Sequence, residues 1–133
     1  LFIKNQRLHY VYNFLGIKPE QEFVSPPLKP GKYTLGMEFA REKTGPNHES
    51  LGTAKLYVND KVVAQGPMRT QSGLFTLQGD GLCVGYDSGD AVSSQYKAPG
   101  TFNGGRIIGV GVTTEKTGYL DLERAAQRAL SRD

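Results

Sequence analysis

The stretch "GDGLCVGYDSGD", residues 79–90, gathers the residue types in this chain that are best suited to chemistry. It holds three carboxylates, four glycines and the only cysteine within twelve positions. Carboxylates in a glycine-rich loop are typical calcium ligands, and a cysteine in an exposed, electropositive setting can be a nucleophile. The same composition also suits a glycine-jointed corner of a β-sheet. These three interpretations predict different functions.

A calcium site would use the oxygens of Asp80, Asp87 and Asp90. The spacing D-x-[DN]-x-[DN]-G of an EF-hand is absent, and the apolar residues between the acids predict a buried strand over 82–85. Asp80 and Asp87 would then lie at opposite ends of that strand. We therefore predict a polar corner and no metal site, with calcium as the alternative.

No residue of the chain is predicted to be catalytic. Cys83 lies between Leu82 and Val84, and an unpaired cysteine is among the most buried residue types, so we predict a structural core cysteine. His9 and His48 have no Ser, Asp or metal-ligand partner at a telling spacing. "GDGLCVG" also lacks the Gly-Lys-Ser/Thr ending of a phosphate loop.

The segment "DSGDAVSSQY", residues 87–96, is the best candidate for a binding or interface surface. Polar loops that follow a strand and are held on a rigid sheet commonly carry recognition, although a plain surface turn is the alternative. We predict an ordered polar loop over 86–96 on one rim of the fold. The binding or interface candidates are Tyr86, Asp87, Ser88, Asp90, Ser93 and Tyr96.

The elements that would position this loop are mostly strands. Apolar runs on both sides of Asn5-Gln6 and of Asn59-Asp60 predict two hairpins. Residues 33–39 alternate between apolar and other side chains, the pattern of a half-buried strand, and "GGRIIGVGVTT", residues 104–114, predicts a longer strand.

The tail is the one helical pattern. In "LDLERAAQRALSRD" apolar residues share one face, which predicts a helix over about 120–131. The predicted elements show no alternation of strands and helices along the chain. We therefore predict a single all-β domain over 1–133, a two-layer antiparallel β-sandwich closed by this short helix.

The composition limits the classes of partner that we expect. The net charge is +3, from 16 basic and 13 acidic residues that are spread along the chain, so we expect no nucleic-acid partner. No 18-residue apolar run occurs, so we expect no membrane association. The single cysteine allows no internal disulfide and leaves the compartment open. The chain begins without Met inside an apolar segment, which predicts a fragment of a longer polypeptide.

Several motifs together resemble a known family. The stretches "KLYVNDKVVAQG", "DGLCVGYDSGDAVSSQY" and "FNGGRIIGVGV" occur in this order, after "HYVYNFLG" and "KYTLGMEF". This ordering resembles the C-terminal region of long bacterial arylsulfatases, and the resemblance covers nearly the whole chain. It implies a concanavalin A-like, laminin-G-type jelly roll.

The resemblance implies an accessory role and no catalysis by this chain. Sulfatases use a C/S-x-P-x-R motif whose Cys or Ser becomes formylglycine, beside a divalent metal such as calcium. Here Gly85 and Asp87 stand where that motif has proline and arginine after Cys83. We therefore expect no cofactor in this chain, a catalytic sulfatase domain of the same polypeptide as its partner, and a carbohydrate-binding module with a sulfated or carbohydrate ligand as the alternative.

Overall fold

The structure is a computed structural model that describes residues 1–14, 16–72 and 81–114, and these residues form an all-β, antiparallel fold. Its three sheets contain the following strands: β1 (Phe2–Lys4), β2 (Arg7–Phe14) and β3 (Ile17–Val24); β4 (Leu35–Thr44), β5 (Glu49–Val58) and β6 (Lys61–Ser72); β7 (Tyr86–Asp87) and β8 (Gly100–Thr101). Within these ranges no helix is long and apolar enough to cross a membrane. The helix predicted over 120–131 lies outside the described residues.

Both predicted hairpins are confirmed. Asn5 and Gln6 have φ angles of 50° and 61°, and the register of β1 and β2 closes around them with Lys4 opposite Arg7. Positive φ at both central residues is the geometry of a type I′ turn, whose twist matches that of the strands. Asn59, at φ 54°, begins the turn between β5 and β6.

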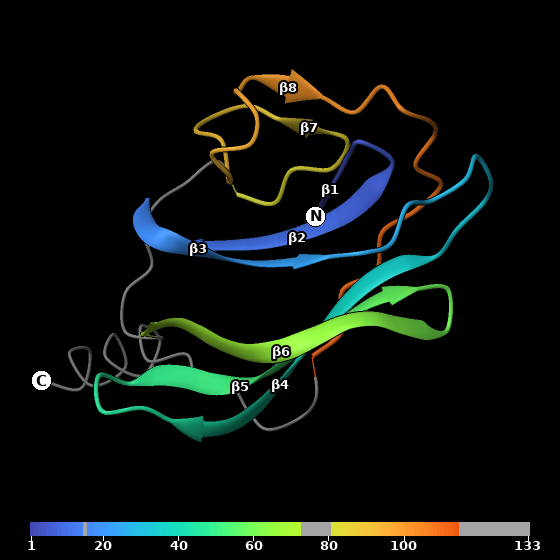
Figure 1. Cartoon of the computed structure of the whole chain (residues 1–133). Helices are drawn as coiled ribbons and strands as arrows, with labels where there is room; N and C mark the ends of the chain where they lie inside the picture. Colours follow the sequence, from blue (N-terminus) through green and yellow to red (C-terminus); the bar gives the residue numbers. More distant parts are fainter. Residues whose placement is uncertain (15, 73–80, 115–133) are drawn as a thin grey trace, which may run out of the picture.

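The three sheets are stacked in layers. Figure 1 shows β1–β2–β3 in the middle, β4–β5–β6 on one side of it and the short β7–β8 pair on the other. The fully buried apolar residues among those described come from β2, β5 and β6; they are Leu8, Val11, Ala54, Leu56 and Met68. The predicted antiparallel β fold is therefore confirmed, and a third layer covers the face of β1–β2–β3 that a two-layer arrangement would leave open.

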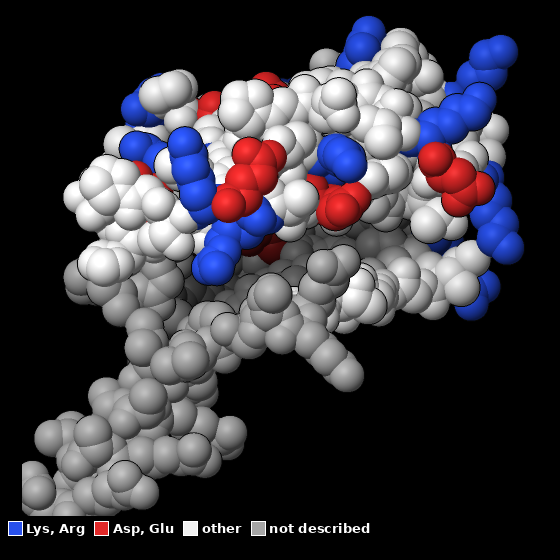
Figure 2. All heavy atoms as spheres, turned by 90° about the horizontal axis from the view of Figure 1, so that it is seen from below, with Lys and Arg blue, Asp and Glu red and all other residues white. Residues whose placement is uncertain are grey.

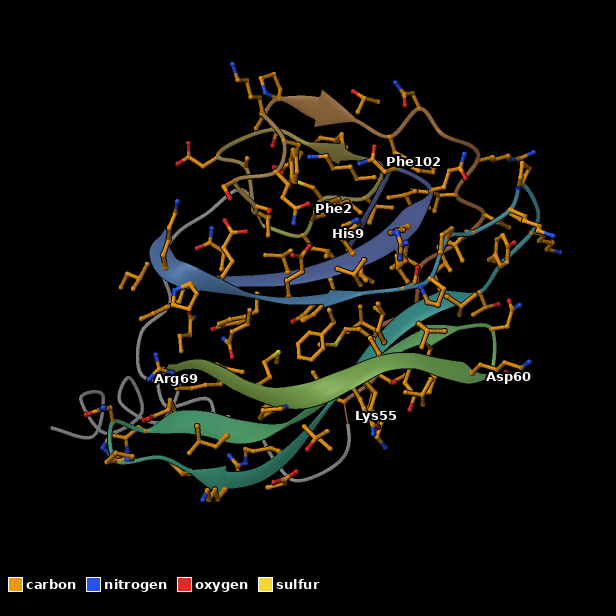
Figure 3. All side chains as sticks on the ribbon, in the orientation of Figure 1. Phe2, His9, Lys55, Asp60, Arg69 and Phe102 are labelled. Atoms are coloured by element: carbon orange, nitrogen blue, oxygen red, sulfur yellow. The ribbon has the colours of Figure 1, made fainter. Side chains whose placement is uncertain are left out.

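The middle sheet presents a different face to each neighbour. Tyr10 and Phe23 are register partners with ring centroids 6.3 Å apart, and a Cβ built on Gly66 of β6 would lie 3.3 Å from the Phe23 ring. Phe23 thus packs on β6 where a glycine leaves room. His9, one residue before Tyr10, points to the β7–β8 side (Figure 3). Successive side chains of a strand alternate between faces, so both faces of β2 and β3 are used.

The alternation predicted for residues 33–39 is confirmed in β4. Leu35, Met37 and Phe39 are half-buried, whereas Glu38 and Ala40 are exposed. On the exposed face of β4–β5–β6 acidic and basic side chains are interspersed (Figure 2), and Lys55 points away from the middle sheet (Figure 3). Mixed charge of this kind is typical of a solvated surface.

Two strand predictions were wrong. Residues 82–85 are not a buried strand: Leu82 is 78% exposed and Cys83 is only half-buried. Gly81 and Gly85 have φ angles of +74° and +80°, so the backbone leaves the extended conformation at both ends of the segment. Cys83 is accordingly not a core cysteine.

Residues 104–114 likewise form no strand, and Ile108 and Val112 are 77% and 72% exposed. A Cβ added at Gly109 or Gly111 would meet nothing within 4 Å. Gly109 and Gly111 have no side chain that could pack on a neighbouring layer. The alternating apolar side chains, such as Ile108 and Val112, therefore remain exposed.

The pairing of β4 and β5 depends on Gly52. An added Cβ would fall on the carbonyl oxygen of Ala40, and it would lie 3.0 Å from the Cα of Arg41. We expect Gly52→Ala to lower the free energy of unfolding by about 1–3 kcal/mol, because the two strands must move apart. The measurement is chemical denaturation. Gly36→Ala in β4 is the control, since its Cβ would meet nothing within 4 Å; equal losses in both variants would contradict the explanation.

Candidate functional site

The polar segment after β7 lies across the face of β1–β2–β3 that points away from β4–β5–β6 (Figure 1). Side chains of the middle sheet bind its backbone. Asn13 Nδ2 donates to the carbonyl of Val92 at 2.9 Å, and Lys4 Nζ donates to the carbonyl of Gln95 at 2.6 Å. The segment was predicted on a rim; the structure places it over a face, because polar groups on that face reach up to it.

Two carboxylates of β3 form the centre of this attachment. Glu20 accepts hydrogen bonds from the Ser93 hydroxyl and the Ser94 amide, both at 2.8 Å. Glu22 accepts from His9 Nδ1 at 2.7 Å and from the side-chain amide (Nε2) of Gln95. Glu20 and Glu22 are two positions apart in one strand, so they share the face that the loop covers.

These hydrogen bonds lower the pKa of both carboxyl groups. The amide of Ser94 and the hydroxyl of Ser93 stabilise ionised Glu20 and lower its pKa below the ordinary 4.5. The His9 ring has the largest effect in lowering the pKa of Glu22, and Gln95 adds to it, against the opposing effect of desolvation. Hydrogen bonds to the charged form favour ionisation.

An aromatic cluster holds the end of the loop. Phe2 stacks on His9 with ring centroids 5.0 Å apart, and Tyr96 meets Phe2 edge-on at 5.2 Å. Figure 3 shows Phe2 and His9 between the middle sheet and β7–β8. The Tyr96 hydroxyl donates to Asp87 Oδ2 and accepts from the amide of Val92 at 3.2 Å. Burial and the bond to Asp87 raise the pKa of Tyr96.

The six predicted site residues separate into two groups. Ser93 is 1% exposed, and Asp87 and Tyr96 are half-buried, so these three attach the loop to itself and to the sheet. The other three, Tyr86, Ser88 and Asp90, are exposed. The loop therefore has an anchored inner side and an outer side that is open to a partner.

Sequence reasoning missed the residues beneath the loop, Glu20 and Glu22 above all. The available signal was two glutamates at alternate positions of the strand-like run "IKPEQEFV", which places charge on one face of a strand. His9 was noted without a partner, because Glu22 is 13 residues away.

Cys83 and the three aspartates of residues 79–90 are the candidates for catalysis and for calcium binding. The Cys83 sulfur lies 3.8 Å from the Ser88 hydroxyl, a weak contact. Within residues 1–14, 16–72 and 81–114 no group of three or more His, Cys, Asp and Glu could hold a metal ion. Asp80, which the calcium alternative requires, lies outside those residues, so that alternative stays a prediction.

Comparisons with protein-family models, curated proteins and solved structures found no match to this chain.

Acid should loosen the loop. A carboxyl group with a lowered pKa in the folded state stabilises the fold above its unfolded pKa, and this stabilisation is lost as the pH falls through the folded value. For Glu20 and Glu22 the loss begins near pH 4.5 and continues below it. We expect amide exchange at Ser94, corrected for the intrinsic rate, to speed up between pH 5.5 and 3.

The double variant Glu20→Gln/Glu22→Gln tests the assignment of this pH effect. It should show fast exchange at Ser94 already at pH 5.5 and little further change on acidification. Glu42→Gln, whose carboxylate accepts a bond from Thr53 on the exposed face of β4–β5, is the control and should keep the pH dependence. A double variant that behaves like the parent chain would contradict the anchoring role.

Ser93 should matter more than Ser88 for stability. The Ser93 hydroxyl is buried. It donates to Glu20 and accepts from the backbone amide of Gln95 at 3.2 Å. Ser93→Ala leaves both partners short of a hydrogen bond, and we expect a loss of about 1–3 kcal/mol in the free energy of unfolding. Ser88→Ala, at an exposed position, should change it by less than about 0.5 kcal/mol. Chemical denaturation measures the free energy of unfolding of both variants. Similar losses in Ser93→Ala and Ser88→Ala would contradict the anchoring role of Ser93.

Proposed function

We propose that this chain is a non-catalytic accessory domain of the arylsulfatase type, which uses the outer side of the 86–96 loop to pack on a catalytic domain of the same polypeptide. The observation that carries the proposal is the way the loop is held. Side chains of Lys4, Asn13, Glu20 and Glu22 fix it from beneath. A surface ordered before binding loses little conformational entropy when a partner docks, so it binds well for its size.

The outer side of the loop has the chemistry of such an interface. Tyr86 and Val92 are 55% and 45% exposed, and exposed Asp90 lies between them in the chain. An aromatic and an aliphatic side chain with a nearby charge suit the centre and rim of a moderately polar contact. In the proposed polypeptide the formylglycine and the calcium ion belong to the catalytic domain. The accessory domain formed by residues 1–133 shapes access to that catalytic site.

The finer architecture belongs to the same proposal. We propose a concanavalin A-like jelly roll, closed by a helix over 120–131. Support comes from the order of the sequence motifs and from the two three-stranded antiparallel sheets that lie face to face.

A carbohydrate-binding module is the second candidate, and one observation favours it. Tyr86 is an exposed aromatic side chain, and Ser88 and Asp90, which follow it closely in the sequence, are exposed too; sugars stack on such rings. Tyr96 is less suited to stacking, because its ring contacts Phe2 and its hydroxyl binds Asp87. In this second function Tyr86 alone is the platform.

The test of the accessory role compares the isolated chain with the full-length polypeptide. We expect the full-length protein to hydrolyse 4-nitrophenyl sulfate and to carry C/S-x-P-x-R upstream. The double variant Tyr86→Ala/Asp90→Lys should lower the melting temperature of the full-length protein by several degrees, because it spoils the contact between the domains. The same variant should leave the isolated chain unchanged.

Asp60→Lys is the control for this experiment. Asp60 lies in the turn between β5 and β6, remote from the loop (Figure 3). An unchanged full-length Tyr86→Ala/Asp90→Lys protein would overturn the interface. Binding of the isolated chain on a glycan array, lost in Tyr86→Ala, would favour the carbohydrate-binding module instead.

A further inference from the structure

A groove opens at one end of the fold, between the middle sheet and β4–β5–β6. It has a volume of about 530 Å³ and is lined by the end of β2, the start of β3, the beginning of β5 and the last residues of β6. A groove of this size falls within the range of small-molecule sites. It lies on the opposite side of β1–β2–β3 from the 86–96 loop, because β3 sends Gln21 towards β6 and Glu20 towards the loop.

One wall of the groove is apolar. Tyr12, Phe14, Ile17 and Pro19 contribute to its lining. Ile17 is 56% exposed, so a ligand could remove apolar surface from water there. Tyr12 is held in place, since its hydroxyl accepts a hydrogen bond from the amide of Gln71. This wall suits a flat or aliphatic body of ligand size.

The charged residues of the lining are two cations and one anion: Lys18, Arg69 and Glu49. Glu49 is 8% exposed, and its carboxylate accepts a hydrogen bond from the backbone amide of Asn47 at 2.8 Å, which fixes its position at the groove. Lys18 lies close enough to Glu20 to contribute to lowering the pKa of that carboxyl group. The lining therefore carries two positive charges and one negative charge, and Lys18 is also attracted to Glu20.

Arg69 is the better placed of the two cations. The Gln21 side chain clamps the Arg69 backbone, donating to its carbonyl at 2.6 Å and accepting from its amide at 2.7 Å. The main chain of Arg69 is thereby fixed while its side chain is exposed. Figure 3 shows Arg69 at the opposite end of its sheet from Asp60. A guanidinium held on a fixed backbone is well suited to binding a sulfate or carboxylate through two hydrogen bonds.

We infer that this groove binds a small amphipathic anion, with an apolar body on the Tyr12–Phe14–Ile17–Pro19 wall and a sulfate, sulfonate or carboxylate on Arg69. The proposal does not rest on the accessory role of the 86–96 loop, because the two surfaces share no exposed side chain. Either can fail while the other stands.

The experiment uses 4-nitrophenyl sulfate as the probe, titrated into the chain and followed by amide chemical shifts. We expect saturable binding in the millimolar range or tighter, with the largest shifts at residues 12–21 and 69–71. Two partial ligands separate the contributions. Inorganic sulfate lacks the ring and 4-nitrobenzyl alcohol lacks the charge, so each should bind at least about tenfold more weakly.

Single substitutions test whether the probe binds in this groove. Arg69→Gln should weaken binding of the probe about tenfold, as expected for loss of a charge-assisted hydrogen bond. Ile17→Ser should weaken it several-fold, since Ile17 is largely exposed and its replacement leaves the fold intact. Lys61→Gln is the matched control, because Lys61 directly follows Asp60 at the start of β6. Asp60 lies at the opposite end of the sheet from Arg69 (Figure 3).

The inference is overturned by the absence of saturable binding of the probe, by shifts that centre on residues 86–96, or by a loss in Lys61→Gln equal to that in Arg69→Gln. Equal binding of 4-nitrobenzyl alcohol and the probe would also overturn it, because the cation would then play no part. Equal binding of inorganic sulfate would overturn the role of the apolar wall. Amide shifts of the free variants show that each is folded before it is titrated.

Discussion

Hydrogen bonds that the carboxylates of Glu20 and Glu22 accept hold the outer layer of this protein on its middle sheet. Each carboxylate takes two donors, from Ser93 and Ser94 and from His9 and Gln95. Glu20 is half-buried and Glu22 is exposed, so these bonds attach the loop to the sheet without burying either charge. The loop and β3 therefore depend on each other: Ser93, Ser94 and Gln95 of the loop supply three of the four donors, and β3 supplies the charge that orders the loop.

Successive side chains of β3 point to opposite faces of the sheet, so the strand also contacts β6 on its other face. Gln21 binds the backbone of Arg69, and Phe23 packs against β6 at Gly66. Towards its centre the contact between the sheets is apolar, with Leu56 and Met68 buried. At the end near Arg69 it becomes polar, and there the groove opens. In the part of the chain that the structure describes, no buried side-chain nitrogen or oxygen lacks a hydrogen-bond partner.

The two candidate surfaces thus lie on opposite sides of one sheet and differ in kind. The outer side of the 86–96 loop exposes Tyr86 and Val92 and is ordered from beneath, which suits a protein partner. The groove is concave, with an apolar wall and a lining that carries two cations and one anion, which suits a small ligand. A domain that packs on an enzyme through one surface could hold an anionic ligand with the other, and the two proposals remain independent because they use different side chains.

Local sequence determined the features whose cause is local. The turns at Asn5-Gln6 and Asn59-Asp60 follow from residues that accept positive φ between apolar runs, and the alternation in β4 follows from the pleat of a strand. The division of the polar loop into anchored and exposed residues could not be read in the same way. It depends on Glu20 and Glu22, which lie more than 70 residues away from Ser93, Ser94 and Gln95 in the chain. It also depends on His9, which binds Glu22.

The failures have the same origin. Residues 82–85 and 104–114 have the composition of strands, but composition does not supply a neighbouring strand to bind or a layer to cover the apolar face. Gly85 turns the backbone at one segment, and Gly109 faces open space in the other. The sequence by itself determined which segments could form strands and turns. Only the tertiary structure decided which of them found partners, because hydrogen-bond pairing and burial depend on residues that the chain brings together from far apart.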